Sequence, residues 1–313
     1  MKKLRVGFLG LVLILSALVF TGCGANSTAD SQGTGFASNG DKKLTVYTTV
    51  YPMYDLTQKI GGDKIQLKNL VPAGTEPHDW EPTPSDMAAL EKADVLIYNG
   101  AGMEPWLDKV LKSLNPEKLV TVEATQGLTL LNSQDETKKL ATDPHVWLDP
   151  MHAKQEMGAI KDALVTADPA NHAYYEKNYV ENAAHFDQLD QEYKVAVSQF
   201  SKKDIVVAHQ AFSYLCNAYG LNQVAIEGLA ADSEPSPARM AEIVKFVQEK
   251  QLKYIFFEEL VSPKVAQTIA QETGASTAVL NPFEGLTESD QQAGKDYFSV
   301  MRDNLEVLKK ALQ

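Results

Sequence analysis

Residues 168–200 read DPANHAYYEKNYVENAAHFDQLDQEYKVAVSQF, one long stretch with no glycine and, after Pro169, no proline. Asp168-Pro169 suits the cap and first turn of a helix. Large apolar residues then recur at helical spacing: Tyr175, Tyr179, Phe186, Leu189, Tyr193, Val197 and Phe200. The pattern predicts a helix of about thirty residues, which at about 1.5 Å per residue would be roughly 45 Å long. Such a helix could join two lobes as a rigid strut.

Short apolar runs that are typical of buried strands lie on both sides of this predicted helix. Amphipathic stretches separate the runs, and strands that alternate with helices predict parallel sheets covered by helices. The runs occupy 44–49, 65–71, 95–98, 205–208, 224–226, 254–257 and 277–280. We therefore expect an α/β fold of two lobes, with an N-terminal lobe over 43–167, a linker helix over 168–200 and a C-terminal lobe over 201–313.

Three helix starts are marked by a hydroxyl residue that precedes proline. The pairs are Thr83-Pro84, Ser236-Pro237 and Ser262-Pro263. Asp86 stands three residues after Thr83, and Gly274 is the expected stop of the helix that follows Ser262. Because the chain has no internal repeat, heptad array or glycine-rich phosphate loop, repeat scaffolds and nucleotide-binding folds lose support.

The N-terminus has the layout of a secretory signal peptide. Basic side chains, among them Lys2 and Arg5, precede an apolar run over 6–20 that is shorter than the roughly 18 residues expected of a membrane span. Cys23 follows small residues, as in the bacterial lipobox, where the signal is removed and the cysteine is acylated. We expect a signal peptide over 1–22 and a lipidated flexible tether over 23–42, which is rich in small polar residues. The chain would then be anchored to the outer face of a bacterial cell membrane.

Charge and cysteine content narrow the functional classes further. The formal net charge of −12 becomes −15 once the three basic side chains of the signal are removed. An acidic chain is poorly suited to nucleic acid and is compatible with a cationic ligand. With Cys23 used as an anchor, Cys216 is the one cysteine left, so an intramolecular disulfide is impossible. Cys216 lies in an apolar segment and is expected to be a small buried side chain.

Three of the six histidines lie in predicted loops. His78 stands in a turn-rich segment, His145 follows Asp143-Pro144, and His209 follows the apolar run over 205–208 directly. Ligands of open α/β sheets bind beyond the carboxyl ends of strands, so His209 is well placed for coordination. The histidines His152, His172 and His185 fall in predicted helices and are weaker candidates. Because the three loop histidines are far apart in sequence, their spacing does not show that they converge.

Five ordered motifs carry a resemblance to a known family. They are PHDWEPTP at 77–84, DPHVWLDP at 143–150, HQAF at 209–212, EPSP at 234–237 and NPFEGLT at 281–287. With them the chain resembles the metal-specific solute-binding lipoproteins of ABC importers, within the zinc-uptake and laminin-binding branch. The resemblance covers nearly all of the mature chain. It implies two α/β lobes joined by a rigid helix, with a metal bound between them and delivered to an ABC permease.

The resemblance also implies a ligand set. The family's ligand positions fall on His78, His145, His209 and Glu284. Three imidazoles and one carboxylate suit Zn²⁺, whereas manganese prefers more oxygen donors. In the manganese branch a carboxylate replaces the third histidine, so His209 favours zinc, with Mn²⁺ as the alternative. Asp149 is a candidate hydrogen-bond partner for the second ring nitrogen of His145, although Asp149-Pro150 also suits a helix start.

Capture of zinc by a monomeric, non-enzymatic protein is the function we expect, and two other functions stay open. A zinc hydrolase would hold the metal through three protein ligands and keep a position free for water. Glu284 would then be a general base away from the metal instead of a ligand. An adhesin for host matrix is the other alternative, since this branch includes laminin-binding members.

Overall fold

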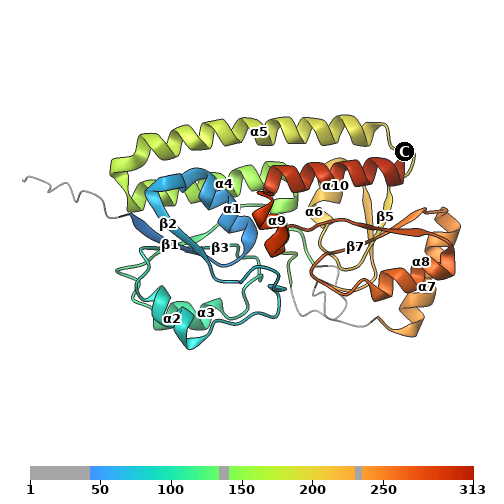
Figure 1. Cartoon of the computed structure of the whole chain (residues 1–313), viewed down its shortest axis with the longest axis horizontal. Coiled ribbons are helices and arrows are strands. Elements are labelled where there is room, and N and C mark those ends of the chain that lie inside the picture. Colours follow the sequence, from blue (N-terminus) through green and yellow to red (C-terminus); the bar gives the residue numbers. More distant parts are fainter. Residues whose placement is uncertain (1–42, 134–140, 230–234) are drawn as a thin grey trace, which may run out of the picture. The chain divides into compact units, whose positions relative to one another are not determined.

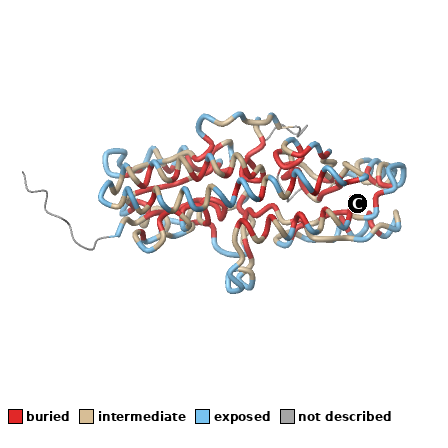
Figure 2. Tube along the Cα trace, turned by 90° about the horizontal axis from the view of Figure 1, so that it is seen from above, coloured by how far each residue is buried: buried red, intermediate tan, exposed pale blue. Residues whose placement is uncertain are grey.

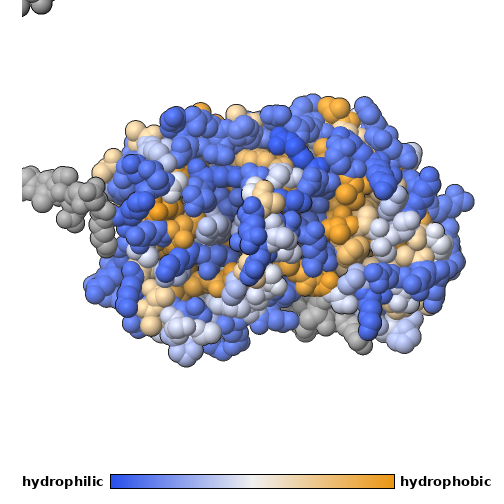
Figure 3. Space-filling model, viewed as in Figure 1, coloured by the Kyte–Doolittle hydropathy of each residue, from blue (hydrophilic) through white to orange (hydrophobic). Residues whose placement is uncertain are grey.

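The computed structural model describes residues 43–133, 141–229 and 235–313 (Figure 1). The predicted signal peptide, tether and acylated Cys23 lie outside these residues, as does Glu234 of the EPSP motif. Within the described part of the chain, no helix combines the length and the apolar character needed to cross a bilayer. Hydrophilic residues cover most of the face seen in Figure 3, with smaller apolar areas between them.

Two four-stranded sheets, one in each half of the chain, form the two lobes. The strands of the first are β1 (Leu44–Thr48), β2 (Ile65–Asn69), β3 (Val95–Tyr98) and β4 (Val120–Glu123), in the order β2-β1-β3-β4. The strands of the second are β5 (Asp204–Val207), β6 (Asn222–Ala225), β7 (Tyr254–Phe257) and β8 (Ser276–Val279), in the order β6-β5-β7-β8. All neighbours pair in parallel, which confirms the predicted fold class.

Strand β4 was not among the predicted apolar runs. Its sequence, Val-Thr-Val-Glu, is short and alternates apolar with polar residues, and none of its residues is fully buried. It lies at the edge of the first sheet, next to β3 alone. An edge strand needs less apolar sequence than a central one because part of it faces solvent.

The helices of the first lobe are short, and local sequence explains their starts. They are α1 (Tyr51–Gly61), α2 (Pro84–Leu90) and α3 (Leu107–Ser113), with a 3₁₀ turn over Gly62–Lys64. At the start of α2, Thr83 accepts a hydrogen bond from the Asp86 backbone while the Asp86 carboxylate accepts one from Thr83 N–H. This is the predicted cap, completed as a reciprocal capping box.

Two long helices, α4 (Pro150–Ala167) and α5 (His172–Ser198), pack against each other along the molecule (Figure 1). The long helix is thus shorter than the predicted 168–200. Pro169–Asn171 forms a separate 3₁₀ turn, in which Asp168 accepts hydrogen bonds from the side chains of Asn171 and Tyr175. These local bonds hold the chain in a tighter turn before α5 begins.

The second lobe carries the remaining helices. They are α6 (Ser213–Tyr219), α7 (Pro237–Lys250), α8 (Lys264–Thr273), α9 (Glu288–Gln292) and α10 (Tyr297–Leu312). Ser236 caps α7 as predicted, and α8 ends at Gly274 in the left-handed conformation. The predicted cap at Ser262 is wrong by one position, because Pro263 occupies the N-cap of α8 and makes no side-chain cap bond.

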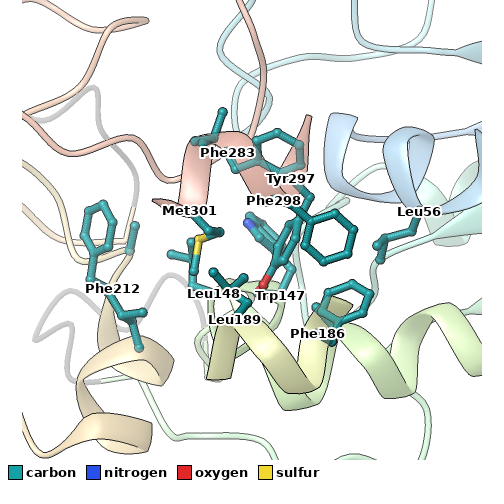
Figure 4. Close-up of a cluster of buried hydrophobic side chains, with 14 of the residues drawn as sticks. Leu56, Trp147, Leu148, Phe186, Leu189, Phe212, Phe283, Tyr297, Phe298 and Met301 are labelled. Atoms are coloured by element: carbon teal, nitrogen blue, oxygen red, sulfur yellow. The ribbon is translucent and has the colours of Figure 1, made fainter. Parts of the chain in front are cut away.

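One continuous apolar core joins the lobes. It includes Leu56 from α1, Phe186 and Leu189 from α5, Phe212 from the second lobe and Met301 from α10 (Figure 4). Helix α5 contacts α1 and α4 as well as α6 and α10, so it packs against both halves of the chain. Figure 2 shows buried and exposed residues alternating along the helices, as expected when one face of each helix packs on a core. The exact lobe boundaries stay a prediction.

Candidate metal centre

Four side chains that the sequence separates widely come together in the structure: His78, His145, His209 and Glu284. One ligand atom from each lies within 4.8 Å of the others. The His145 Nε2 atom lies 3.2 Å from His78 Nε2 and 3.4 Å from His209 Nε2. Glu284 Oε1 lies 2.8 Å from His145 Nε2, 3.1 Å from His209 Nε2 and 3.8 Å from His78 Nε2. These four residues are called the His₃Glu group below.

The spacing of the His₃Glu group matches a tetrahedral zinc site. With metal–nitrogen and metal–oxygen bonds of about 2.0–2.1 Å, neighbouring ligand atoms of a regular tetrahedron stand about 3.3 Å apart. Five of the six distances between these atoms run from 2.8 to 3.8 Å around that value, and the sixth, between His78 and His209, is at most 4.8 Å. His145 and His209 are fully buried and the Glu284 side chain is 4% exposed, so competing water has little access. The donor set can therefore hold one small divalent cation in four-coordination.

Strand ends position the two C-terminal members of the group. His209 follows β5 by two residues, and Glu284 follows β8 by five. Parallel strands deliver their carboxyl ends to one edge of a sheet, where ligands of open α/β folds bind. His78 lies in the turn before α2, and His145 lies immediately before a 3₁₀ turn over Val146–Leu148. The first lobe thus contributes two imidazoles from loops.

Asp143 orients the imidazole of His145. Its Oδ1 atom lies 2.8 Å from His145 Nδ1 and also accepts the His145 backbone N–H at 3.0 Å. Nδ1 donates to the carboxylate, which leaves the lone pair of Nε2 facing the centre of the group. The candidate partner Asp149 is wrong: its side chain caps α4 by accepting from Met151 N–H, and its other oxygen faces His152. The helix-start reading of Asp149-Pro150 is the one that holds.

Glu258 orients the imidazole of His209, as Asp143 orients that of His145. Its Oε1 atom lies 2.6 Å from His209 Nδ1, and both side chains are buried. Sequence reasoning missed both carboxylates. A signal for Glu258 was present, because this residue follows β7 directly and obeys the same strand-end rule as His209. Asp143 stands two residues before a ligand histidine, a position from which it can fold back to the ring.

Buried carboxylates and imidazoles shift one another's pKa values in the His₃Glu group. Burial alone would lower the pKa of His145, but the Asp143 carboxylate, followed by Glu284, raises it to about 9. The pKa of His209 is likewise raised well above its ordinary value, against burial, by Glu258 and Glu284. Burial opposes ionisation of Glu284, yet the histidines hold its pKa well below the usual range. Without a metal, protons on the imidazoles balance the carboxylates.

A narrow cavity adjoins the group on the side of Glu284. Its wall includes Glu76, Glu258 and Glu259 together with Asn281. Burial raises the pKa of Glu76, and Glu284 adds to the rise while His78 opposes it. The carboxyl groups that line the cavity give it a negative character, which attracts cations.

The remaining histidines and the cysteine stand apart from the group. His152 lies in α4 against the Tyr214 ring, His172 is exposed on α5 beside Glu176, and His185 contacts the Phe298 ring. Cys216 is buried, and burial raises the pKa of its thiol. It is a packing residue, as predicted.

Two lobes of the same parallel topology, with a His₃Glu group that could hold a metal ion, define a two-lobed α/β protein with a candidate metal-binding site. A family model described as zinc-uptake complex component A, periplasmic (ZnuA) matches residues 46–311. The chain belongs to this family, which confirms the resemblance seen in the motifs.

Curated relatives and solved structures agree with this assignment. The chain is 41% identical to the high-affinity zinc uptake system protein ZnuA of Bacillus subtilis (strain 168), with 97% of each chain covered. It is 38% identical to the zinc-binding lipoprotein AdcA of Streptococcus pneumoniae (strain R6), where 99% of this chain spans 61% of the relative.

The solved structures are similar over most of the folded part. The Zn(II)-bound ZnuA-like domain of S. pneumoniae AdcA has a TM-score of 0.77 and 40% identity, with 87% of this chain and 99% of that chain covered. The laminin-binding protein Lmb of Streptococcus agalactiae, described as bifunctional with adhesin and metal-transporting activity, has a TM-score of 0.79 and 35% identity over 87% of this chain and 100% of that one.

Proposed function

We propose that this chain captures Zn²⁺ outside the cytoplasmic membrane and delivers it to the permease of an ABC importer. The observation that carries the proposal is the near-tetrahedral spacing of the four donor atoms of His78, His145, His209 and Glu284. Membership of the zinc-uptake family and the zinc-bound state of a similar structure support it. Zinc is cargo here, and the role of the protein is to bind and release it.

Capture is favoured over hydrolysis by the place of Glu284. A hydrolytic zinc site needs an open coordination position, with the general base standing away from the metal. Glu284 Oε1 instead lies 2.8 and 3.1 Å from two imidazole nitrogens, which is ligand spacing. Four protein donors complete a tetrahedron and leave no place for an activated water. We therefore infer that the protein is not an enzyme.

Zinc is favoured over manganese by the donor types. Three of the four donors are imidazole nitrogens, and the single carboxylate contributes one close oxygen. Zn²⁺ accepts four nitrogen and oxygen ligands in a tetrahedron, whereas Mn²⁺ prefers more oxygen donors and a larger coordination number. The carboxylates Asp143 and Glu258 each face the Nδ1 atom of a histidine and are not members of the His₃Glu group.

The setting of the protein follows from the N-terminal motif and the family. We infer that the signal over 1–22 is removed, that acylated Cys23 anchors a monomer to the outer face of the membrane, and that 23–42 is a tether. A tethered protein stays close to its permease while its site can turn toward the medium. The laminin-binding name of one structural neighbour makes adhesion the second candidate function.

Metal content and competition binding test the proposal. The mature chain is compared with His209→Ala and Glu284→Ala, and with His172→Ala, which removes an exposed histidine of α5. One tightly held zinc per chain, weakened by the first two changes and unchanged by the third, is expected. Zinc binding that is indifferent to His209→Ala and Glu284→Ala would refute the site. Binding of Mn²⁺ in preference to Zn²⁺ would refute the choice of metal.

A further inference from the structure

The residue before Glu284 has an unusual backbone. Phe283 has φ of 60°, in the left-handed region that suits glycine and is rare for a bulky aromatic residue. This backbone conformation is strained for such a residue, and it persists only where the surroundings enforce it. The neighbouring Gly285 does not carry the positive φ. The strain therefore lies on the peptide that leads directly into the fourth member of the His₃Glu group.

Contacts from the first lobe and from α10 enforce this conformation. The Phe283 ring is fully buried and meets the Tyr51 ring edge-on at 5.3 Å and the Tyr297 ring at 5.6 Å. Figure 4 shows Phe283 beside Tyr297 in the core. The Phe283 backbone N–H also donates to the Asn281 side chain at 2.7 Å.

Hydrogen bonds to main-chain carbonyls hold the chain on both sides of Phe283. The Trp147 indole donates to the Pro282 carbonyl at 2.8 Å, and Tyr51 N–H donates to the Glu284 carbonyl at 3.4 Å. Glu284 belongs to the second lobe by sequence, yet its main chain is held by residues of the first. The φ and ψ angles of Phe283 set the direction of the next peptide and hence of the Glu284 side chain.

We propose that Phe283 is a positioning residue for metal binding: its left-handed backbone, held by the rings of Tyr51 and Tyr297, directs the Glu284 carboxylate at the three histidines. The proposal rests on the proposed zinc-binding function. Phe283 acts through Glu284 and does not contact the metal. A residue that relaxed into the common extended or helical region would turn the carboxylate away and leave a three-histidine site.

A double-mutant cycle tests this, with zinc competition measured at pH 7 on the mature chain. Phe283→Leu keeps a buried apolar side chain but loses the edge-on ring contacts. We expect it to weaken zinc binding about 10-fold when Glu284 is present, the scale found for groups that orient a ligand. In a Glu284→Gln chain the same change should cost less than about twofold, because the carboxylate it positions is gone.

The matched control is Phe200→Leu, which changes another buried aromatic residue of the same core; in the described part of the chain, none of the ring contacts of Tyr51, Phe283 and Tyr297 involves Phe200. This change should lower the melting temperature without changing zinc affinity by more than about twofold, because Phe200 shares no ring partner with Phe283 in the described part of the chain. Co²⁺ spectra give a second readout: Phe283→Leu should move the visible absorption toward that of Glu284→Gln, and Phe200→Leu should not.

The outcomes separate this proposal from the zinc-binding function. Equal losses from Phe283→Leu in the parent chain and in the Glu284→Gln chain would overturn the positioning role while leaving the zinc site intact. A parent chain without zinc, or an inert Glu284→Gln change, would instead overturn the zinc site itself. If Phe283→Leu does not fold, Tyr51→Leu replaces it in the same cycle, since it removes one of the two rings that hold Phe283.

Discussion

Removing the carboxylate of Glu258 should weaken zinc binding by an amount that depends on whether the replacement can still accept a hydrogen bond from His209. The Glu258 Oε1 atom lies 2.6 Å from His209 Nδ1, and both side chains are buried, so this is a charge-assisted hydrogen bond with little solvent screening. Loss of such a partner typically costs 10–100-fold in metal affinity, or about 1.4–2.8 kcal/mol. Glu258→Gln keeps an acceptor for the ring N–H and should fall near the lower figure. Glu258→Leu removes the acceptor and should fall near the upper one.

The pH dependence of this loss adds a sharper test. Glu258 also raises the pKa of His209 in the metal-free protein, so at pH 7 the parent must displace a proton before zinc can bind. In the variants the pKa of His209 is lower, so zinc displaces that proton more easily. This gain offsets part of the affinity that the variants lose because His209 is a weaker ligand. The difference between parent and Glu258→Leu should therefore grow from pH 7 to pH 9.

The assay is competition with a chromophoric zinc chelator, followed at both pH values. Glu249→Gln is the control, because this exposed side chain of α7 pairs with Lys245 and lies outside the metal centre. It should change affinity by less than about twofold, as expected for a distant site. Glu258→Leu affinity within about threefold of the parent at pH 9 would refute the reasoning, since that loss is well below the range expected for an orienting carboxylate.

Three further predictions follow from buried polar groups. Zinc affinity of the parent should rise by up to roughly 100-fold per pH unit from pH 7 toward 9, because the raised pKa values of His145 and His209 mean that two protons leave on binding. Calorimetry in buffers of different ionisation enthalpy measures the number of protons released. The ion pairs of His145 stabilise the metal-free fold below about pH 6.5, and their contribution should fade as pH rises through about 9, which thermal scans of the metal-free chain would detect. Glu156 is fully buried, and neither of its oxygens has a hydrogen-bond partner among the described residues. Its pKa is raised well above normal by burial and then by Asp149, so above the ordinary value the unfolded chain ionises at this residue and the native chain does not. Glu156→Leu should therefore stabilise the protein at pH 7 by about 1–3 kcal/mol in denaturant melts, and an unchanged or lower midpoint would contradict this.

Local sequence was enough for most of the fold. Buried parallel strands are short apolar runs, and seven of the eight described strands were predicted from them. Proline after a hydroxyl residue marked the starts of α2 and α7, because these caps are local hydrogen bonds between residues three apart. Strand β4 escaped because an edge strand does not require a fully apolar sequence. The start of α5 was misplaced because its first turn is decided by the Asp168 side chain and not by residue propensity.

At the metal centre, sequence identified the candidate ligands, and the tertiary structure decided how they are arranged. The chain order of motifs identified His78, His145, His209 and Glu284 as candidates, yet residues 64 to 75 positions apart can converge only through the packing of two lobes. Tertiary structure alone decided that Asp143, and not Asp149, faces His145, and that Glu258 faces His209. It also placed the left-handed backbone at Phe283 and not at Gly285, two residues further along. Such choices depend on contacts between distant segments, whereas sequence patterns report what neighbouring residues prefer.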